Sequence, residues 1–127
     1  MVKDDHVYLM SMSDFVNEAL NLVKDKSWTE FNKDKVLRYA VVHIIQNIGE
    51  AARHISMEMR EDNPEISWRE IIGMRNIIVH DYLQVDYEAV WNVATKNLPE
   101  LKPQVESIIY KHQMDSGDSV CSGSNGV

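Results

Sequence analysis

Arg75, His80 and Tyr82 place a permanent cation, an imidazole and a phenol within eight residues of one another. An arginine can donate two parallel hydrogen bonds to a phosphodiester, and it stabilises the negative charge that builds there during cleavage. A histidine side chain can move protons near neutral pH. Together these residue types predict a phosphate-handling site whose chemistry needs no metal ion.

A purely structural interpretation of the same segment stays open. In that interpretation Arg75 ends in solvent, His80 is stabilised by the dipole at a helix C-terminus, and Tyr82 packs its ring. Geometry also limits the functional interpretation, because five residues turn through about 140° on an ideal helix, so Arg75 and His80 would point apart. Either the helix ends before His80, or the two side chains meet across a symmetric interface. Both arrangements predict a cleft at the end of a helix.

A polar stripe follows one face of the longest predicted helix and consists of His43, Asn47, Glu50 and His54. Histidine and glutamate at such spacing suggest a metal site. However, His43 and Glu50 would lie about 10 Å apart along the helix axis, too far for one ion with ligand bonds of roughly 2 Å. The favoured interpretation is a solvated or interface-facing side of the helix. The stripe could also line the same cleft as Arg75 and His80.

The composition fits one helical domain. The chain has 127 residues, of which 44% are hydrophobic, and only three are prolines and five are glycines. Thirteen basic side chains stand against twenty acidic ones, so the formal net charge is −7. This balance disfavours a basic nucleic-acid binder that relies on counterion release.

The sequence predicts a cytoplasmic protein. Cys121 is the single cysteine, so no internal disulfide can form and no oxidising compartment is required. The segment Met1–Phe15 carries several charged residues and does not resemble a signal peptide. No apolar run approaches the roughly eighteen residues of a membrane span, so no membrane association is expected.

Apolar residues at helical spacing predict an all-α fold, an up-and-down bundle of about five helices. Capping boxes at Ser27–Glu30 and Ser67–Glu70 predict helix starts, while Pro64 and Pro99 predict helix ends. In the first helix the predicted apolar face consists of Val7, Met10, Phe15, Ala19, Leu22 and Val23. Residues 1–113 form this domain, and 114–127 are predicted to be a disordered polar tail without an assigned role. The predicted helices span residues 7–23, 34–61, 68–79, 86–98 and 101–111, with a short helical turn after Ser27.

The spacing Arg75-x4-His80-x-Tyr82 resembles the RX4HXY motif of the HepT-like proteins, a family of the HEPN superfamily. Other stretches agree with this family in the same order along the chain. They are Asn47–Ala52 (NIGEAA), Pro64–Asn76 (PEISWREIIGMRN), and Val85–Trp91 together with Asn97–Pro99. The resemblance covers about residues 6 to 111.

This resemblance implies a small helical bundle that forms a homodimer, with the motif residues in a cleft at the two-fold axis. It also implies a toxin of a two-gene, type VII toxin–antitoxin module that acts as a metal-independent endoribonuclease without a cofactor. The implied partner is an MntA-like minimal nucleotidyltransferase, an antitoxin that silences the toxin by transferring AMP to the motif tyrosine. Carried over to this chain, the catalytic residues would be Arg75 and His80, the modified residue Tyr82, and the supporting residues Asn47, Glu50, Asn76 and Asp81.

A non-catalytic alternative also stays open, in which the chain is a helical partner that docks on a nucleotidyltransferase and binds a nucleotide. The net charge of −7 favours this alternative slightly, since a ribonuclease must attract a polyanion. From Lys33 to Arg60, however, five basic residues face three acidic ones. Incubation of the protein with RNA in EDTA discriminates between the two interpretations.

Overall fold

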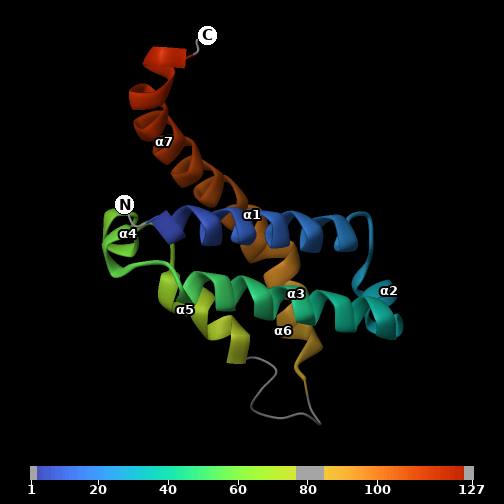
Figure 1. Cartoon of the computed structure of the whole chain (residues 1–127). Coiled ribbons are helices and arrows are strands. Elements are labelled where there is room, and N and C mark those ends of the chain that lie inside the picture. The colour runs from blue at the N-terminus through green and yellow to red at the C-terminus, as the bar shows by residue number, and fades with distance from the viewer. Residues whose placement is uncertain (1–2, 77–84, 125–127) are drawn as a thin grey trace.

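The computed structural model describes the backbone of residues 3–76 and 85–124 and the side chains of residues 4–76 and 85–113. Within these ranges every regular element is helical, which confirms the predicted all-α bundle. The helices α1 (Lys3–Val23) and α3 (Lys35–Arg53) lie antiparallel and side by side, and α7 (Leu98–Ser124) crosses α1 and packs on it (Figure 1). Within the described ranges no helix is long and apolar enough to cross a membrane.

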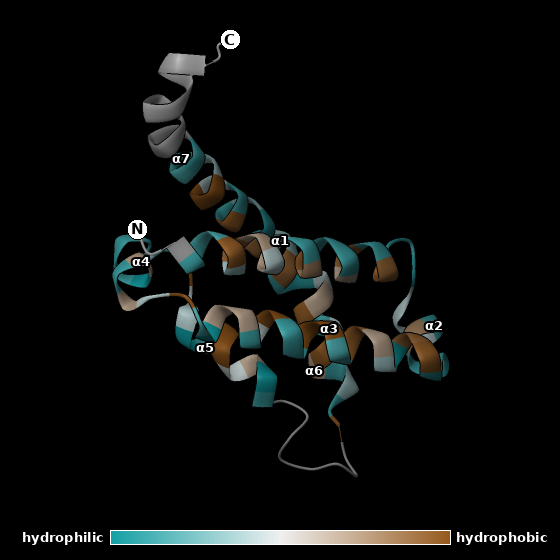
Figure 2. Cartoon of the chain, viewed as in Figure 1, coloured by the Kyte–Doolittle hydropathy of each residue, from teal (hydrophilic) through white to brown (hydrophobic). Residues whose placement is uncertain are grey.

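The core is formed by the facing sides of these long helices, and polar and apolar residues alternate along them as in amphipathic helices (Figure 2). The sequence also predicts an apolar face on the long helix 34–61, and its residues are buried apart from the half-buried Ala40: Leu37, Ala40, Val41, Ile44, Ile45, Ile48, Ala51, Ala52 and Ile55. The predicted face of α1 is wrong at its start. Val7 and Met10 are exposed, because the buried residues of α1 follow a strict three-and-four spacing that excludes both. The fully buried side chains of α1 are Leu9, Met12, Val16 and Ala19.

The predicted helix 34–61 is two helices in the structure, α3 and α4 (Met57–Asp62). The break is stabilised by Asp5 of α1, whose carboxylate accepts hydrogen bonds from the Ser56 amide at 2.8 Å and the Ser56 hydroxyl at 2.6 Å. The hydroxyl oxygen of Ser56 in turn accepts a hydrogen bond from the Met59 amide and so caps α4. Asp5 is only 1% exposed. A partner fifty-one residues away thus ends a helix that contains no proline.

The segment before Arg75 consists of α5 (Trp68–Gly73) and a 3₁₀ turn, η1 (Met74–Asn76). Residues 77–79, which complete the predicted helix 68–79, lie outside the described residues. The capping box predicted at Ser67 is not formed, because the Ser67 side chain makes no capping hydrogen bond. The loop before α5 is held instead by Trp68, whose indole N–H donates to the Asn63 carbonyl at 2.9 Å. At the other predicted box, Ser27 and Glu30 do cap α2 (Trp28–Lys33) reciprocally.

The C-terminal part of the chain is one continuous helical run, made of α6 (Tyr87–Asn92), a π turn η2 (Val93–Asn97) and α7. The prediction that Pro99 separates two helices is wrong. A proline ring clashes with the carbonyl four residues earlier in a regular α-helix, and the wider π turn lies directly before Pro99 and relieves this crowding. The hydroxyl of Thr95, in the π turn, donates to the Trp91 carbonyl of α6 at 2.7 Å.

The last helix also runs further than predicted, to Ser124 instead of Lys111. No proline follows Pro103 in this stretch, and extending a helix costs less than starting one. The backbone of 114–124 is therefore helical where the sequence predicted the start of a tail.

Candidate active site

Arg75 reaches the long helix α3 because the backbones of α3 and of α5–η1 touch at Gly49. A Cβ atom added at Gly49 would lie 2.9 Å from both the Arg75 amide nitrogen and the Ile71 carbonyl oxygen. Only a glycine allows two helical backbones to approach this closely. The contact places the Arg75 side chain beside the residue that follows Gly49, which is Glu50. The Arg75 Nη1 donates to Glu50 Oε1 at 3.2 Å.

An open hollow of about 440 Å³ lies next to this ion pair and is lined by Gln46, Asn47, Glu50, Arg75 and Asn76. The structure thus brings together Arg75, Asn76, Asn47 and Glu50, which the sequence predicted as parts of one site. Gln46 is an addition that the prediction did not include. It lies on the flank of the polar stripe, one residue before Asn47. His43, at the other end of the stripe, does not line the hollow.

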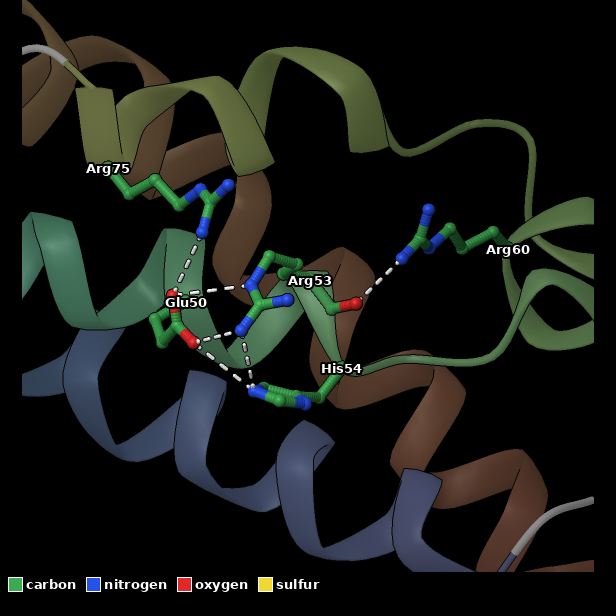
Figure 3. Close-up of polar contacts among 5 residues, drawn as sticks. All are labelled: Glu50, Arg53, His54, Arg60 and Arg75. Carbon is green, nitrogen blue, oxygen red and sulfur yellow. Dashed lines mark hydrogen bonds and ion pairs between the residues drawn. The ribbon is translucent and has the colours of Figure 1, made fainter.

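Glu50 is the centre of a polar network of three donors (Figure 3). Besides Arg75, its carboxylate accepts a hydrogen bond from Arg53 Nη2 at 2.7 Å and lies 3.2 Å from His54 Nε2. Arg53 also donates from Nε to Glu50 Oε1 at 3.4 Å. The sequence prediction assigned no role to Arg53, although an arginine three residues after a glutamate shares its helix face.

These contacts fix the ionisation of Glu50. The hydrogen bond from Arg53, followed by those from Arg75 and His54, lowers the pKa of Glu50 from 4.5 to about 2, although partial desolvation acts in the opposite direction. The same carboxylate raises the pKa of Arg53. At neutral pH the network therefore holds one carboxylate between two permanent cations.

The remaining predicted site residues, His80, Asp81 and Tyr82, lie outside the described residues. The described chain before them ends in η1, so α-helical geometry stops at Gly73, before Arg75. Within residues 4–76 and 85–113, no group of three histidine, cysteine, aspartate or glutamate side chains is arranged to hold a metal ion.

Comparisons with known proteins give the family. A family model described as "Ribonuclease HepT-like" matches residues 12–108. A protein of Methanocaldococcus jannaschii named "Putative RNase MJ1380" is 34% identical over 84% of this chain and 97% of its own length. The "Probable ribonuclease HepT" of Thermococcus cleftensis is 29% identical over 80% of this chain and 92% of its own length. No solved structure matches the chain. The family match spans the helices that carry Glu50 and Arg75, and the chain belongs to the HepT-like ribonuclease family.

Proposed function

We propose that this protein is a toxin-type endoribonuclease that cleaves RNA without a metal ion, with Arg75 and His80 as its catalytic residues. The observation that carries the proposal is the placement of Arg75. Its guanidinium is held by Glu50 at the wall of an open, polar hollow. An arginine fixed in this way is pre-oriented for a phosphate, and pre-oriented charge stabilises a transition state more than a mobile side chain does.

The reaction proceeds by attack of the ribose 2′-oxygen on the adjacent phosphorus. His80 takes the proton of the 2′-hydroxyl or delivers a proton to the leaving 5′-oxygen. The new bond joins the 2′-oxygen to phosphorus, the bond to the 5′-oxygen breaks, and the product ends in a 2′,3′-cyclic phosphate. Arg75 donates hydrogen bonds to the non-bridging oxygens as their charge increases. Asn47 and Asn76 supply polar side chains at the same hollow, and Asp81 supports His80.

The proposal includes regulation by a partner. The protein acts in the cytoplasm as the toxin of a toxin–antitoxin pair, and an MntA-like nucleotidyltransferase transfers AMP from ATP to the Tyr82 hydroxyl. The tyrosine oxygen bonds to the α-phosphorus, and pyrophosphate and the hydroxyl proton are released. An AMP group two residues from His80 adds a phosphate that competes with RNA for Arg75. Mass spectrometry after co-expression with such an enzyme should find AMP on Tyr82, and an adduct on another residue counts against this step.

The central test is cleavage of RNA by the purified protein in EDTA. Activity should persist in EDTA, and His80→Ala should lower the cleavage rate roughly 10²- to 10⁴-fold, as expected for an acid–base group. Arg75→Ala should lower it roughly 10²-fold or more. Full activity of His80→Ala with unchanged helical circular dichroism, or complete loss of wild-type activity in EDTA, contradicts the proposal.

The alternative function is a non-catalytic partner that docks on a nucleotidyltransferase and binds a nucleotide. The observation that favours it is the formal net charge of −7, which repels RNA at long range. In that case the wild-type protein should bind AMP or ATP at the Arg75 hollow and leave RNA intact.

A further inference from the structure

Two arginine side chains share one carboxylate oxygen beside the hollow. Arg75 Nη1 and Arg53 Nε donate to the same Oε1 of Glu50, at 3.2 and 3.4 Å. Two guanidinium groups this close repel each other, and the negative charge of Glu50 between them offsets the repulsion. The pair is therefore held together in the free protein, before any phosphate binds.

The two arginines face different surroundings. Arg75 lines the hollow, whereas Arg53 lies one helical turn beyond Glu50 and is not part of the lining. The Arg53 side chain is 44% exposed. Its hydrogen bonds to described residues use Nε and Nη2, and its Nη1 donates to none of them. Arg53 thus lies beside Glu50 at the rim of the hollow, and its Nη1 can donate to a ligand.

The partial negative charge at the C-terminus of α3, next to Arg53, is offset by another arginine. A helix C-terminus carries partial negative charge, which disfavours an approaching phosphate. Here Arg60 of α4 donates to the carbonyl of Arg53 at 2.9 Å and to that of Ile55 at 3.1 Å, so it offsets this charge (Figure 3). Glu50 is shared by two cations, Arg53 and Arg75, while Arg60 donates to the main-chain carbonyl of Arg53 (Figure 3).

We propose that Arg53 is a substrate-binding residue that holds a phosphate of the RNA next to the phosphate held by Arg75. This inference rests on the proposed ribonuclease function. A strand whose reacting phosphate lies in the hollow continues beyond it, and the exposed Arg53 guanidinium lies next to Glu50 in the wall of the hollow, within reach of a neighbouring phosphate. Its planar donors suit a phosphate, and its contact with Glu50 reduces the side-chain freedom that is lost on binding.

The test compares two substrates and two variants. A dinucleotide contains only the phosphate that is cleaved, whereas a longer single-stranded RNA also offers its neighbours. Arg53→Gln should raise KM for the longer RNA roughly 10-fold or more, the effect of losing one charge-assisted hydrogen bond, with kcat within about 2-fold. Cleavage of the dinucleotide should fall clearly less than cleavage of the longer RNA, because the dinucleotide has no neighbouring phosphate for Arg53 to hold. Arg53→Lys, which keeps the charge but not the planar donors, should recover part of the affinity for the longer RNA.

Lys26→Gln is the matched control, because it removes one positive charge from an exposed side chain in the turn between α1 and α2, near the opposite end of α3 (Figure 1). Lys26→Gln should leave KM and kcat unchanged for both substrates. A 2′-O-methyl RNA cannot be cleaved, so its binding can be measured directly. The slope of the logarithm of its binding constant against the logarithm of the salt concentration should be smaller in magnitude by about 0.7 in Arg53→Gln and unchanged in Lys26→Gln.

Each other outcome overturns the inference. If Arg53→Gln loses as much cleavage of the dinucleotide as of the longer RNA, Arg53 acts through Glu50 on Arg75. If it loses cleavage of neither substrate, Arg53 contacts no phosphate. If the wild type cleaves neither substrate, the proposed ribonuclease function fails. The 2′-O-methyl RNA then decides the inference separately, because equal salt slopes in wild type and Arg53→Gln, or no binding at all, contradict it.

Discussion

At the scale of single residues, the role of Glu50 follows from its ionisation. Its bonds to Arg53, Arg75 and His54 hold its pKa near 2, so the carboxylate is charged at any pH near neutrality. A group that stays ionised does not exchange protons with a substrate during turnover. In the proposed mechanism Glu50 is therefore a positioning residue for Arg75, and proton transfer is assigned to His80.

The first prediction concerns the pH dependence of this arrangement. A carboxylate with a lowered pKa keeps its bonds at every pH above its ordinary value of 4.5 and loses them as the pH falls towards 2. Glu50→Gln should lower kcat/KM roughly 10-fold, because Arg75 loses its charged partner. The acid limb of the pH–rate profile should keep the wild-type midpoint, since a carboxylate with a pKa of about 2 does not titrate in that range.

Glu58→Gln is the control, because Glu58 is an exposed glutamate of α4 and lies outside the hollow. It should change neither the rate nor the pH profile. An acid limb that moves in Glu50→Gln would show that Glu50 itself takes part in proton transfer.

At the scale of helices, the site depends on the contact between α3 and α5–η1. The closest approach is at Gly49, where the neighbouring atoms are the Arg75 nitrogen and the Ile71 oxygen of the main chain. Backbone atoms cannot rotate away as a side chain can, so extra volume at this position must push the two helices apart. Because Arg75 lies in the displaced segment, stability and activity should change together.

Gly49→Ala is therefore expected to destabilise the protein by about 1–3 kcal/mol, the usual range for overpacking a core, and to lower the cleavage rate as well. Gly73→Ala is the matched control, since a Cβ at Gly73 meets nothing within 4 Å and alanine favours helix. That variant should be as stable as wild type or slightly more stable. Urea denaturation of both variants measures the difference, and equal stabilities would contradict the close approach at Gly49.

The break between α3 and α4 allows another prediction at this scale. Asp5→Ala removes the buried acceptor of two Ser56 hydrogen bonds and should cost about 1–3 kcal/mol of unfolding free energy. Asp4→Ala removes an exposed carboxylate from the same turn of α1 and should cost much less. Denaturation midpoints compare the two, and an equal loss in both variants would show that the Asp5–Ser56 contact contributes nothing.

The local capping signals at Ser27 and Ser67 both predicted a helix start correctly, but the predicted capping box forms at Ser27 and not at Ser67, whereas features fixed by distant partners were missed. The capping box at Ser27 involves residues three apart, so the sequence contains the whole interaction. The break before Ser56 needs Asp5 from another helix, and the π turn before Pro99 is a backbone adjustment without its own residue pattern. In the site, the helical stripe and the resemblance found Asn47 and Glu50. The pairing of Arg53 with Glu50 is local to α3, but only the packing of α5–η1 brings Arg75 to the same carboxylate and so gives Arg53 a place beside the site.

At the scale of the whole molecule, the acidic chain carries its candidate site where two arginines share one carboxylate. The hollow is open, and within the described ranges one protomer contributes to it from α3 and η1 only. A small helical domain that exposes such a half-open site is well suited to complete it with a second copy, because two-fold symmetry brings two identical edges together. We therefore expect a homodimer, and sedimentation should give about twice the 14.7 kDa of one chain.

The last prediction tests whether the dimer builds the site. If Arg75 of one protomer acts with His80 of its partner, a mixed dimer of one Arg75→Ala chain and one His80→Ala chain contains one intact site and one site that lacks both groups. Such a mixed dimer should recover roughly half of the wild-type rate, while each variant alone stays at least roughly 10²-fold slower. If both groups act within one protomer, every site of the mixed dimer carries a defect and no activity returns. Differently tagged chains, co-expressed and purified through both tags, measure this directly. Recovery supports the symmetric cleft, whereas a dimer without recovery shows that each protomer has its own complete site.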